Sequence, residues 1–186
     1  MTRDGRGQGD GAEPARDGDV ITRVGRFADR DLWSAEGWCT IEKALGLVGT
    51  RSAIILLREA FLGSRRFEEL ARRTGLSDAV AAKRLKQLVD DGLLTQHPYR
   101  EPGSRTRHEY VLTERGRSLF PVLVALKNFG AGVGGGLDGL EFVHAGCGGQ
   151  LTTQVRCAAG HDVPVEQVEA RFAPGAGQLR DLETGD

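Results

Sequence analysis

The sequence predicts a mainly α fold with one small β hairpin, in the α+β class. Apolar residues recur at helical spacing in several short segments between about residues 39 and 130, and glycine ends most of these segments. Two segments with strand character then flank the turn sequence Glu101-Pro102-Gly103-Ser104. The length of 186 residues suits one domain with extensions.

The composition divides the chain into five expected parts. Residues 1–37 alternate Gly, Asp and Arg with few apolar residues, which predicts a flexible tail. We expect the main domain at residues 38–130, a glycine-rich linker at 131–141, a small Cys/His-containing extension at 142–175 and a second tail at 176–186. No apolar run approaches the ~18 residues of a membrane helix, and the N-terminus lacks the apolar core of a signal peptide. We therefore expect a cytoplasmic protein without a membrane partner.

The net charge of −1 conceals opposite charges in two parts of the chain. Residues 51–117 contain 14 Lys and Arg against 9 Asp and Glu, a net charge of +5, whereas residues 131–186 contain 3 against 8, a net charge of −5. The middle of the chain is therefore the part suited to a polyanion, although a surplus of this size indicates nucleic-acid binding only weakly.

The most clearly marked helix runs from Ser77 to Gly92. Ser77 is a favourable N-cap and Gly92 a favourable C-terminal residue. Ala81, Leu85 and Leu88 share one face with Val80 beside them, and we expect this face to be buried. The opposite face combines short side chains with cations, as a helix that enters a DNA groove requires; it carries Asp78, Ala79, Ala82, Lys83 and Lys86, with Arg84 at its border. We predict that these residues and Ser77 contact DNA. In isolation, an ordinary amphipathic helix with a solvated basic face would explain this pattern better.

The flanking segments favour DNA binding. A shorter helix with Phe67, Leu70 and Ala71 on one face ends at Gly75, and two helices joined by such a tight turn predict a helix-turn-helix. The hairpin that follows, residues 93–97 with 108–112, would stand beside the second helix as a wing. Its tip carries three cations that could meet phosphates or a minor groove, namely Arg100, Arg105 and Arg107.

Three further helices complete the predicted domain. We expect one from about residue 40 to 48, with Ile41, Ala44, Leu45 and Val48 facing inward, and a nearly all-apolar one from 52 to 61. The third runs from Glu114 to Phe129, and Pro121 in its interior should bend it. Its apolar stripe has little inner surface to cover in so small a domain, which predicts a homodimer interface.

Several of these runs resemble the HxlR-type winged helix-turn-helix transcriptional regulators. The matching features are Cys39, the runs 56–63 and 65–67, the helix end Leu85-Lys86-Gln87-Leu88-Val89-Asp90-Asp91-Gly92-Leu93 and the run His108-Glu109-Tyr110-Val111-Leu112-Thr113-Glu114-Arg115-Gly116. The resemblance covers about residues 39–130. It implies a dimeric bacterial regulator that binds operator DNA, some members of which sense electrophiles or oxidants through the cysteine matched by Cys39. The family usually has tryptophan where this chain has Ser52.

Cys39 precedes the first helix, where the helix dipole favours a thiolate and Glu42 opposes it. A redox or electrophile sensor is one interpretation, and a small buried cysteine is the other. A non-covalent small-molecule effector, or none, is equally compatible with the sequence.

The extension contains two short pairs of potential metal ligands, His144-x2-Cys147 and Cys157-x3-His161. The segment 151–155 between them could be one arm of a hairpin, and such a hairpin would bring four ligands together as a tetrahedral zinc site requires. Related proteins usually carry a second Cys-x2-Cys pair here, whereas this chain has Gly160 in place of its last cysteine. The prediction is a zinc-ribbon-like β extension; a small β extension with buried cysteines is the alternative.

The function predicted from these features is that of a homodimeric DNA-binding transcriptional regulator acting on a near-palindromic site in double-stranded DNA. An enzyme is not expected, because the sequence shows no phosphate-binding glycine loop, no recognisable Ser/His/Asp set and no paired carboxylates in a convincing pocket. The alternative is a winged-helix module for protein or RNA contacts, with the acidic C-terminal part as a docking surface.

Overall fold

The structure, a computed structural model, describes residues 20–30, 38–100, 106–131, 133 and 139–174. Contacts divide the chain into two units. The larger unit spans residues 38–153, and the described part of the smaller one consists of residues 20–30 and 154–174. Each unit is described by itself.

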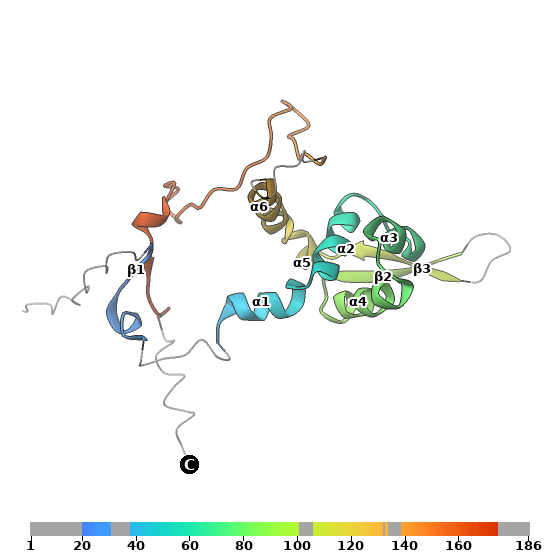
Figure 1. The fold of residues 1–186 in the computed structure, drawn as a ribbon, viewed down its shortest axis with the longest axis horizontal. Coiled ribbons are helices and arrows are strands. Elements are labelled where there is room, and N and C mark those ends of the chain that lie inside the picture. The colour runs from blue at the N-terminus through green and yellow to red at the C-terminus, as the bar shows by residue number, and fades with distance from the viewer. Residues whose placement is uncertain (1–19, 31–37, 101–105, 132, 134–138, 175–186) are drawn as a thin grey trace, which may run out of the picture. The chain divides into compact units, whose positions relative to one another are not determined.

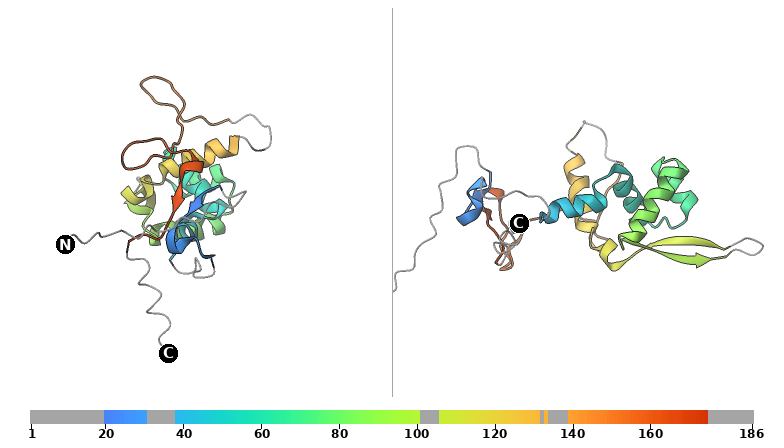
Figure 2. Two further views of the ribbon diagram at one scale, coloured as in Figure 1. Left: turned by 90° about the vertical axis from the view of Figure 1, so that its left-hand side faces the viewer. Right: turned by 90° about the horizontal axis from the view of Figure 1, so that it is seen from below.

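The larger unit has the mixed composition that the sequence predicts, with helices around one antiparallel hairpin (Figure 1). The elements in order are α1 (Thr40–Val48), α2 (Arg51–Phe61), α3 (Phe67–Thr74), α4 (Asp78–Asp90), β2 (Leu94–Tyr99), β3 (Arg107–Leu112), α5 (Glu114–Arg117) and α6 (Phe120–Ala131). The hairpin pairs Leu94 with Leu112 at its base and Tyr99 with Arg107 at its far end. Figure 2 (right) shows the two strands running side by side away from the helices.

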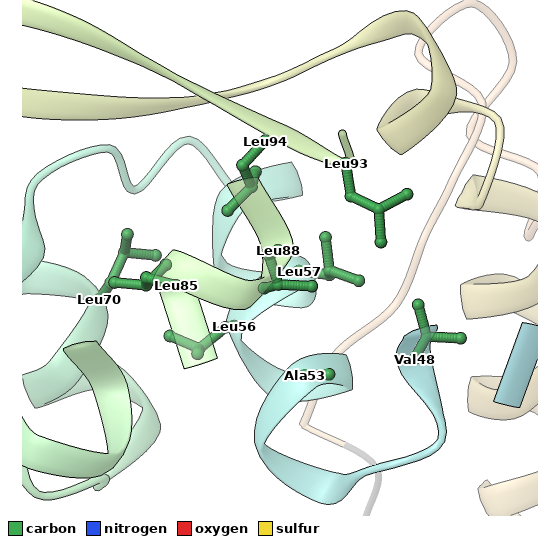
Figure 3. Packing of buried hydrophobic residues seen from close by; sticks show 9 residues of the cluster. All are labelled: Val48, Ala53, Leu56, Leu57, Leu70, Leu85, Leu88, Leu93 and Leu94. Atoms are coloured by element: carbon green, nitrogen blue, oxygen red, sulfur yellow. The ribbon is translucent and has the colours of Figure 1, made fainter. Parts of the chain in front are cut away.

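The core is built mainly from leucines of α2, α3, α4 and the start of the hairpin (Figure 3). Leu56, Leu57, Leu70, Leu85 and Leu88 are at most 1% exposed. Burying one such side chain contributes roughly 1.5–3 kcal/mol. Leu93 and Leu94 extend the cluster into the hairpin, so α4 and the hairpin share one core.

Two helices differ from their prediction. The inward face expected for α1 is largely exposed: Ile41 is 70% and Leu45 58% exposed, and only Val48 is buried. The single helix expected from Glu114 to Phe129 is divided into α5 and α6. Pro121 is therefore the second residue of α6. A backbone N–H at this position would have no acceptor within the helix, so proline is tolerated there. Pro121 marks the start of a helix instead of a bend.

The smaller unit joins segments from near both ends of the chain. β1 (Thr22–Arg23) pairs in parallel with β4 (Glu169–Ala170), and the rings of Phe27 and Phe172 meet edge to face at 5.2 Å. Its described part also contains two short 3-10 helices, η1 (Gly25–Phe27) and η3 (Val165–Gln167). The predicted tail at 1–37 is therefore too broad, because strand pairing between Thr22 and Glu169, 147 positions apart, leaves no local pattern in the sequence.

The C-terminal extension also differs from its predicted form. The expected hairpin arm at 151–155 is not a strand; single antiparallel bridges at Val143–Gln150 and Arg156–Asp162 each close a tight turn instead. The first turn lies in the larger unit and the second in the smaller one. Within the part of the chain that the structure describes, no helix has the length and apolar content needed to cross a bilayer.

Candidate nucleic-acid interface

The turn between α3 and α4 has the geometry of a helix-turn-helix. Gly75 ends α3 in the left-handed conformation at φ 66°, which glycine adopts without a Cβ penalty. Two residues later, the Ser77 hydroxyl accepts a hydrogen bond from the N–H of Val80 and caps α4. Both ends of the turn are thus fixed by the residues that mark them in sequence.

The structure confirms the buried face of α4 at three of its four predicted positions. Ala81, Leu85 and Leu88 are fully buried, whereas Val80 is 46% exposed. Each residue turns the helix by 100°, so Val80 projects well away from Ala81 and the core. The prediction of a buried Val80 was wrong.

The outward face of α4 begins with small side chains. Ser77, Asp78, Ala79 and Ala82 are exposed and none is longer than an aspartate, so the first turn can approach another surface closely. Lys83 and Lys86 are also exposed and follow one turn later, whereas Arg84 is half-buried at the border.

The lysines of α4 differ in their partners. Lys86 Nζ lies 2.5 Å from Asp90 Oδ2, with both side chains more than half exposed. Lys83 forms no ion pair among the described residues. Its charge is therefore available to an external anion. The exposed ion pair between Lys86 and Asp90 contributes about 0.3–0.5 kcal/mol to stability. Lys86 could therefore bind a phosphate in place of Asp90 at small cost.

Two of the three wing arginines lie in the part of the chain that the structure describes. Arg105 lies outside the described residues, and Arg100 is exposed directly after β2. Arg107 instead begins β3 opposite Tyr99, and its Nη1 donates to Glu68 Oε1 at 3.2 Å. The contact with Glu68 ties Arg107 to the first turn of α3.

The wing is attached to the start of α3 at several points. The Tyr110 N–H donates to the Arg65 carbonyl at 2.8 Å, and Arg66 pairs with Glu109 in a β-bridge. The Arg66 guanidinium also lies over the Tyr99 ring, 4.9 Å from its centroid. These contacts fix the direction of the hairpin relative to the helix-turn-helix.

The base of the wing is attached to the end of α4 through Thr113. Its hydroxyl donates to the Gly92 carbonyl at 2.7 Å and accepts from the Gly116 N–H at 2.9 Å. A Cβ at Gly116 would overlap the Leu93 carbonyl oxygen, so only glycine fits. Arg115 adds a bond from Nη1 to the Asp91 carbonyl.

These anchoring residues were not among the predicted site residues. Most of them nevertheless belong to the runs that carry the family resemblance, namely Arg65, Arg66, Glu109, Tyr110, Thr113, Arg115 and Gly116. The contacts of Glu68, Arg66 and Tyr99 join segments more than 30 residues apart and have no local signature.

Cys39 occupies the N-cap of α1, as predicted, and is half-buried. Its side chain makes no capping hydrogen bond, while its carbonyl accepts from the Lys43 N–H at 3.1 Å. Sensing by this thiol stays a prediction.

The two Cys/His pairs form two similar turns. His144 Nδ1 lies 3.3 Å from Cys147 Sγ, and His161 Nδ1 lies 3.5 Å from Cys157 Sγ. A glycine at positive φ closes each turn, Gly148 in the first and Gly160 in the second. Backbone N–H groups, first that of His161 and then that of Ala159, lower the pKa of the exposed Cys157 thiol because they donate to its sulfur.

Each turn fits half of a zinc site. Donors on one tetrahedral zinc lie roughly 3.6 Å apart when Zn–N is about 2.05 Å and Zn–S about 2.3 Å. Among the described residues, however, no three His, Cys, Asp or Glu side chains are grouped to hold a metal. Zinc bound by His144, Cys147, Cys157 and His161 therefore stays a prediction, which metal analysis of the purified chain and of Cys147→Ser would test.

Comparison with known proteins identifies the family. The model of the HxlR-like helix-turn-helix matches residues 47–135. An HTH-type transcriptional regulator of Mycobacterium tuberculosis is 36% identical over 139 residues, which cover 73% of this chain and 87% of the relative. The chain belongs to the HxlR-like helix-turn-helix family. A regulator of Synechocystis is likewise 36% identical, over 94 residues that cover 50% of this chain and 68% of the relative.

Solved structures extend this similarity beyond the helix-turn-helix. PA1607, described as a proposed transcription factor, aligns with a TM-score of 0.65 and 29% identity over 75% of this chain and 96% of its own. PA1374 from Pseudomonas aeruginosa aligns with a TM-score of 0.55 and 28% identity over 77% of this chain and 99% of its own. The winged-helix fold is confirmed, and the chain is an HxlR-type transcriptional regulator.

Proposed function

We propose that this HxlR-type regulator acts as a two-fold homodimer on a near-palindromic operator. The observation that carries the proposal is a set of exposed apolar side chains on α1 and α6, which we call the α1/α6 face. It consists of Ile41, Leu45, Val122, Leu126 and Phe129, each between 47% and 78% exposed. A surface of this kind on two helices of one unit is typical of an interface.

The dimer would set the spacing of the operator. Two-fold symmetry places two copies of α4 about one DNA turn, ~34 Å, apart, and each would enter a major groove. The small side chains of the first turn of α4 would approach the base edges, followed by Lys83, Arg84 and Lys86. Arg100, Arg105 and Arg107 of the wing would meet the backbone, with Glu68 exchanged for a phosphate at Arg107.

The association is tested by light scattering with Phe129→Glu. A charge in an apolar interface should convert a micromolar dimer to a monomer, because the charge must lose its hydration. Val143→Glu serves as the control, since Val143 is 48% exposed and lies outside the α1/α6 face. A wild-type chain that is monomeric at micromolar concentration contradicts the proposed dimer.

DNA binding is tested by its salt dependence on the DNA upstream of the protein's own gene. The double variant Arg105→Ala/Arg107→Ala should reduce the salt slope by about 0.9 for each phosphate that the two arginines neutralise. Lys83→Ala should instead relax the preference at one operator position, if the lysine reaches a base edge. An unchanged salt slope in the double variant would mean that the wing does not contact DNA. RNA bound in preference to duplex DNA would favour the alternative interaction module.

Regulation through Cys39 belongs to the same proposal. The half-buried thiol lies at the N-terminus of α1, a helix of the α1/α6 face, so a covalent adduct there would disturb the dimer. Operator affinity of wild type and Cys39→Ser is compared before and after diamide. If diamide changes operator affinity equally in both proteins, or in neither, Cys39 is only a packing residue.

A further inference from the structure

Ion pairs of two kinds lie on the helix-turn-helix and the wing. The pair of Arg73 with Glu69 and that of Lys86 with Asp90 each join residues four positions apart in one helix. Arg107 and Glu68 are 39 positions apart and join β3 to α3, with Nη1 and Oε1 separated by 3.2 Å. A pair within one helix needs only that helix, whereas the pair of Glu68 and Arg107 exists only in the folded domain.

Backbone contacts bring Glu68 and Arg107 together. The Tyr110 N–H donates to the Arg65 carbonyl at 2.8 Å, and a β-bridge joins the adjacent residues of the two segments. Glu68 follows Arg65 by three positions in the first turn of α3, and Arg107 precedes Tyr110 by three positions in β3. The ends of both side chains are therefore held near each other by the attachment of the wing to α3.

The pair is accessible to an external anion. The Arg107 side chain is 51% exposed and that of Glu68 61% exposed. A guanidinium donates the same kind of charged hydrogen bonds to a carboxylate and to a phosphate. Because an exposed ion pair is weak, a DNA phosphate can take the place of Glu68 on Arg107.

The exchange leaves an unfavourable charge behind. Glu68 makes no other hydrogen bond or ion pair among the described residues, so its carboxylate loses its partner when Arg107 binds a phosphate. It stays on the first turn of α3, where the helix dipole offsets only part of its charge. The carboxylate then repels the phosphate that has replaced it. Each of these effects opposes DNA binding.

We propose that Glu68 competes with the DNA backbone for Arg107 and thereby lowers the affinity of the regulator for duplex DNA of every sequence. The proposal rests on the proposed function, in which Arg107 meets a phosphate. Since phosphates carry no sequence information, Glu68 weakens binding to the operator and to unrelated DNA by the same factor. Glu68 therefore sets the protein concentration at which the operator is occupied and leaves the preference for the operator unchanged.

The competition is tested by a double-mutant cycle. Binding of wild type, Glu68→Gln, Arg107→Ala and the double variant is measured by fluorescence anisotropy on the DNA upstream of the gene and on an unrelated duplex of equal length. Glu68→Gln keeps the shape of the side chain and should bind both duplexes about two- to fivefold more tightly, a factor that corresponds to one exposed ion pair. In the Arg107→Ala background this gain should disappear, because the group for which Glu68 competes is absent.

Glu69→Gln is the matched control. It removes the same charge from the neighbouring position of α3, and its partner Arg73 is not a predicted DNA contact. Its effect should be equal with and without Arg107→Ala and measures the contribution of net charge alone. Circular dichroism melting curves show that the variants are folded. The proposal is overturned if Glu68→Gln behaves as Glu69→Gln does, has no effect, or changes the affinity for one duplex only.

Elution from a heparin column separates this proposal from the proposed function. Glu68→Gln should elute at a higher salt concentration than wild type, and this shift should be lost in the Arg107→Ala background. Such coupling on heparin in a chain that binds no duplex DNA retains the competition and rejects the proposed function. Duplex binding without coupling between Glu68 and Arg107 rejects the competition and retains the proposed function.

Discussion

Residues 51–94 and residues 139–174 are held together in different ways. The first region contains seven fully buried leucines. The second contains no buried side chain in its described structure and is formed by turns, single bridges and a two-residue strand. Burial determines the fold of the first region, whereas the second is held by backbone hydrogen bonds, both within its turns and between β4 and β1. The two should therefore respond differently to mutation.

The largest difference is expected on removing apolar side chains. Leu85→Ala should lower the free energy of unfolding by about 2–5 kcal/mol, because Leu85 is fully buried in the core that α2, α3 and α4 share. Val155→Ala should change it by less than about 0.5 kcal/mol, since Val155 is 68% exposed. Urea denaturation followed by circular dichroism measures both. Equal effects would remove the distinction between the regions.

Gly116→Ala tests the contact between the wing base and α4. The added Cβ would overlap the Leu93 carbonyl oxygen, and the backbone shift required should cost about 1–3 kcal/mol. Gly130→Ala is the matched control, because a Cβ there meets nothing within 4 Å and α6 should gain up to about 1 kcal/mol. A stable Gly116→Ala protein would show that the wing base can move.

Gly148→Ala tests whether the turns of the second region are independent of the core. Its φ of 69° disfavours a side chain by roughly 1 kcal/mol, a cost that only the local turn should bear. We expect faster hydrogen exchange at the Cys147 and Gly148 amides and an unchanged urea midpoint. A lowered midpoint would mean that the turn unfolds together with the core.

The smallest effect concerns the Cys157 thiol. Backbone N–H groups of His161 and Ala159 favour the thiolate and lower its pKa, so alkylation by iodoacetamide should reach half of its maximal rate at a lower pH in the folded chain than in urea. Peptide mapping by mass spectrometry across a pH series gives both midpoints. Coincident midpoints would mean that the turn does not hold these donors in solution.

The same contrast explains what the sequence could predict. The recognition helix, its cap at Ser77 and the buried positions Ala81, Leu85 and Leu88 follow from a 3.6-residue period that burial imposes. Val80 was assigned to the wrong face because periodicity alone does not fix the width of a buried stripe. The strand expected at 151–155 failed because no buried face enforces a period there.

The functional face was predictable in part for a similar reason. The exposed cations of α4 were found because they lie opposite the buried stripe. The tie between Arg107 and Glu68 joins residues 39 positions apart and could not be inferred locally. The outward orientation of α1 was also missed, because an apolar stripe has the same pattern whether its own core or a second subunit covers it.

The parallel pairing of β1 with β4 has a practical consequence for shortened forms of this protein. Thr22 and Val24 donate their backbone N–H groups to Val168 and Ala170, at 3.0 Å each, and Phe27 packs on Phe172. Removing one terminal segment would expose the unpaired backbone and the aromatic ring of the other, which favours aggregation. A fragment for crystallisation or NMR should therefore retain both terminal segments or omit both.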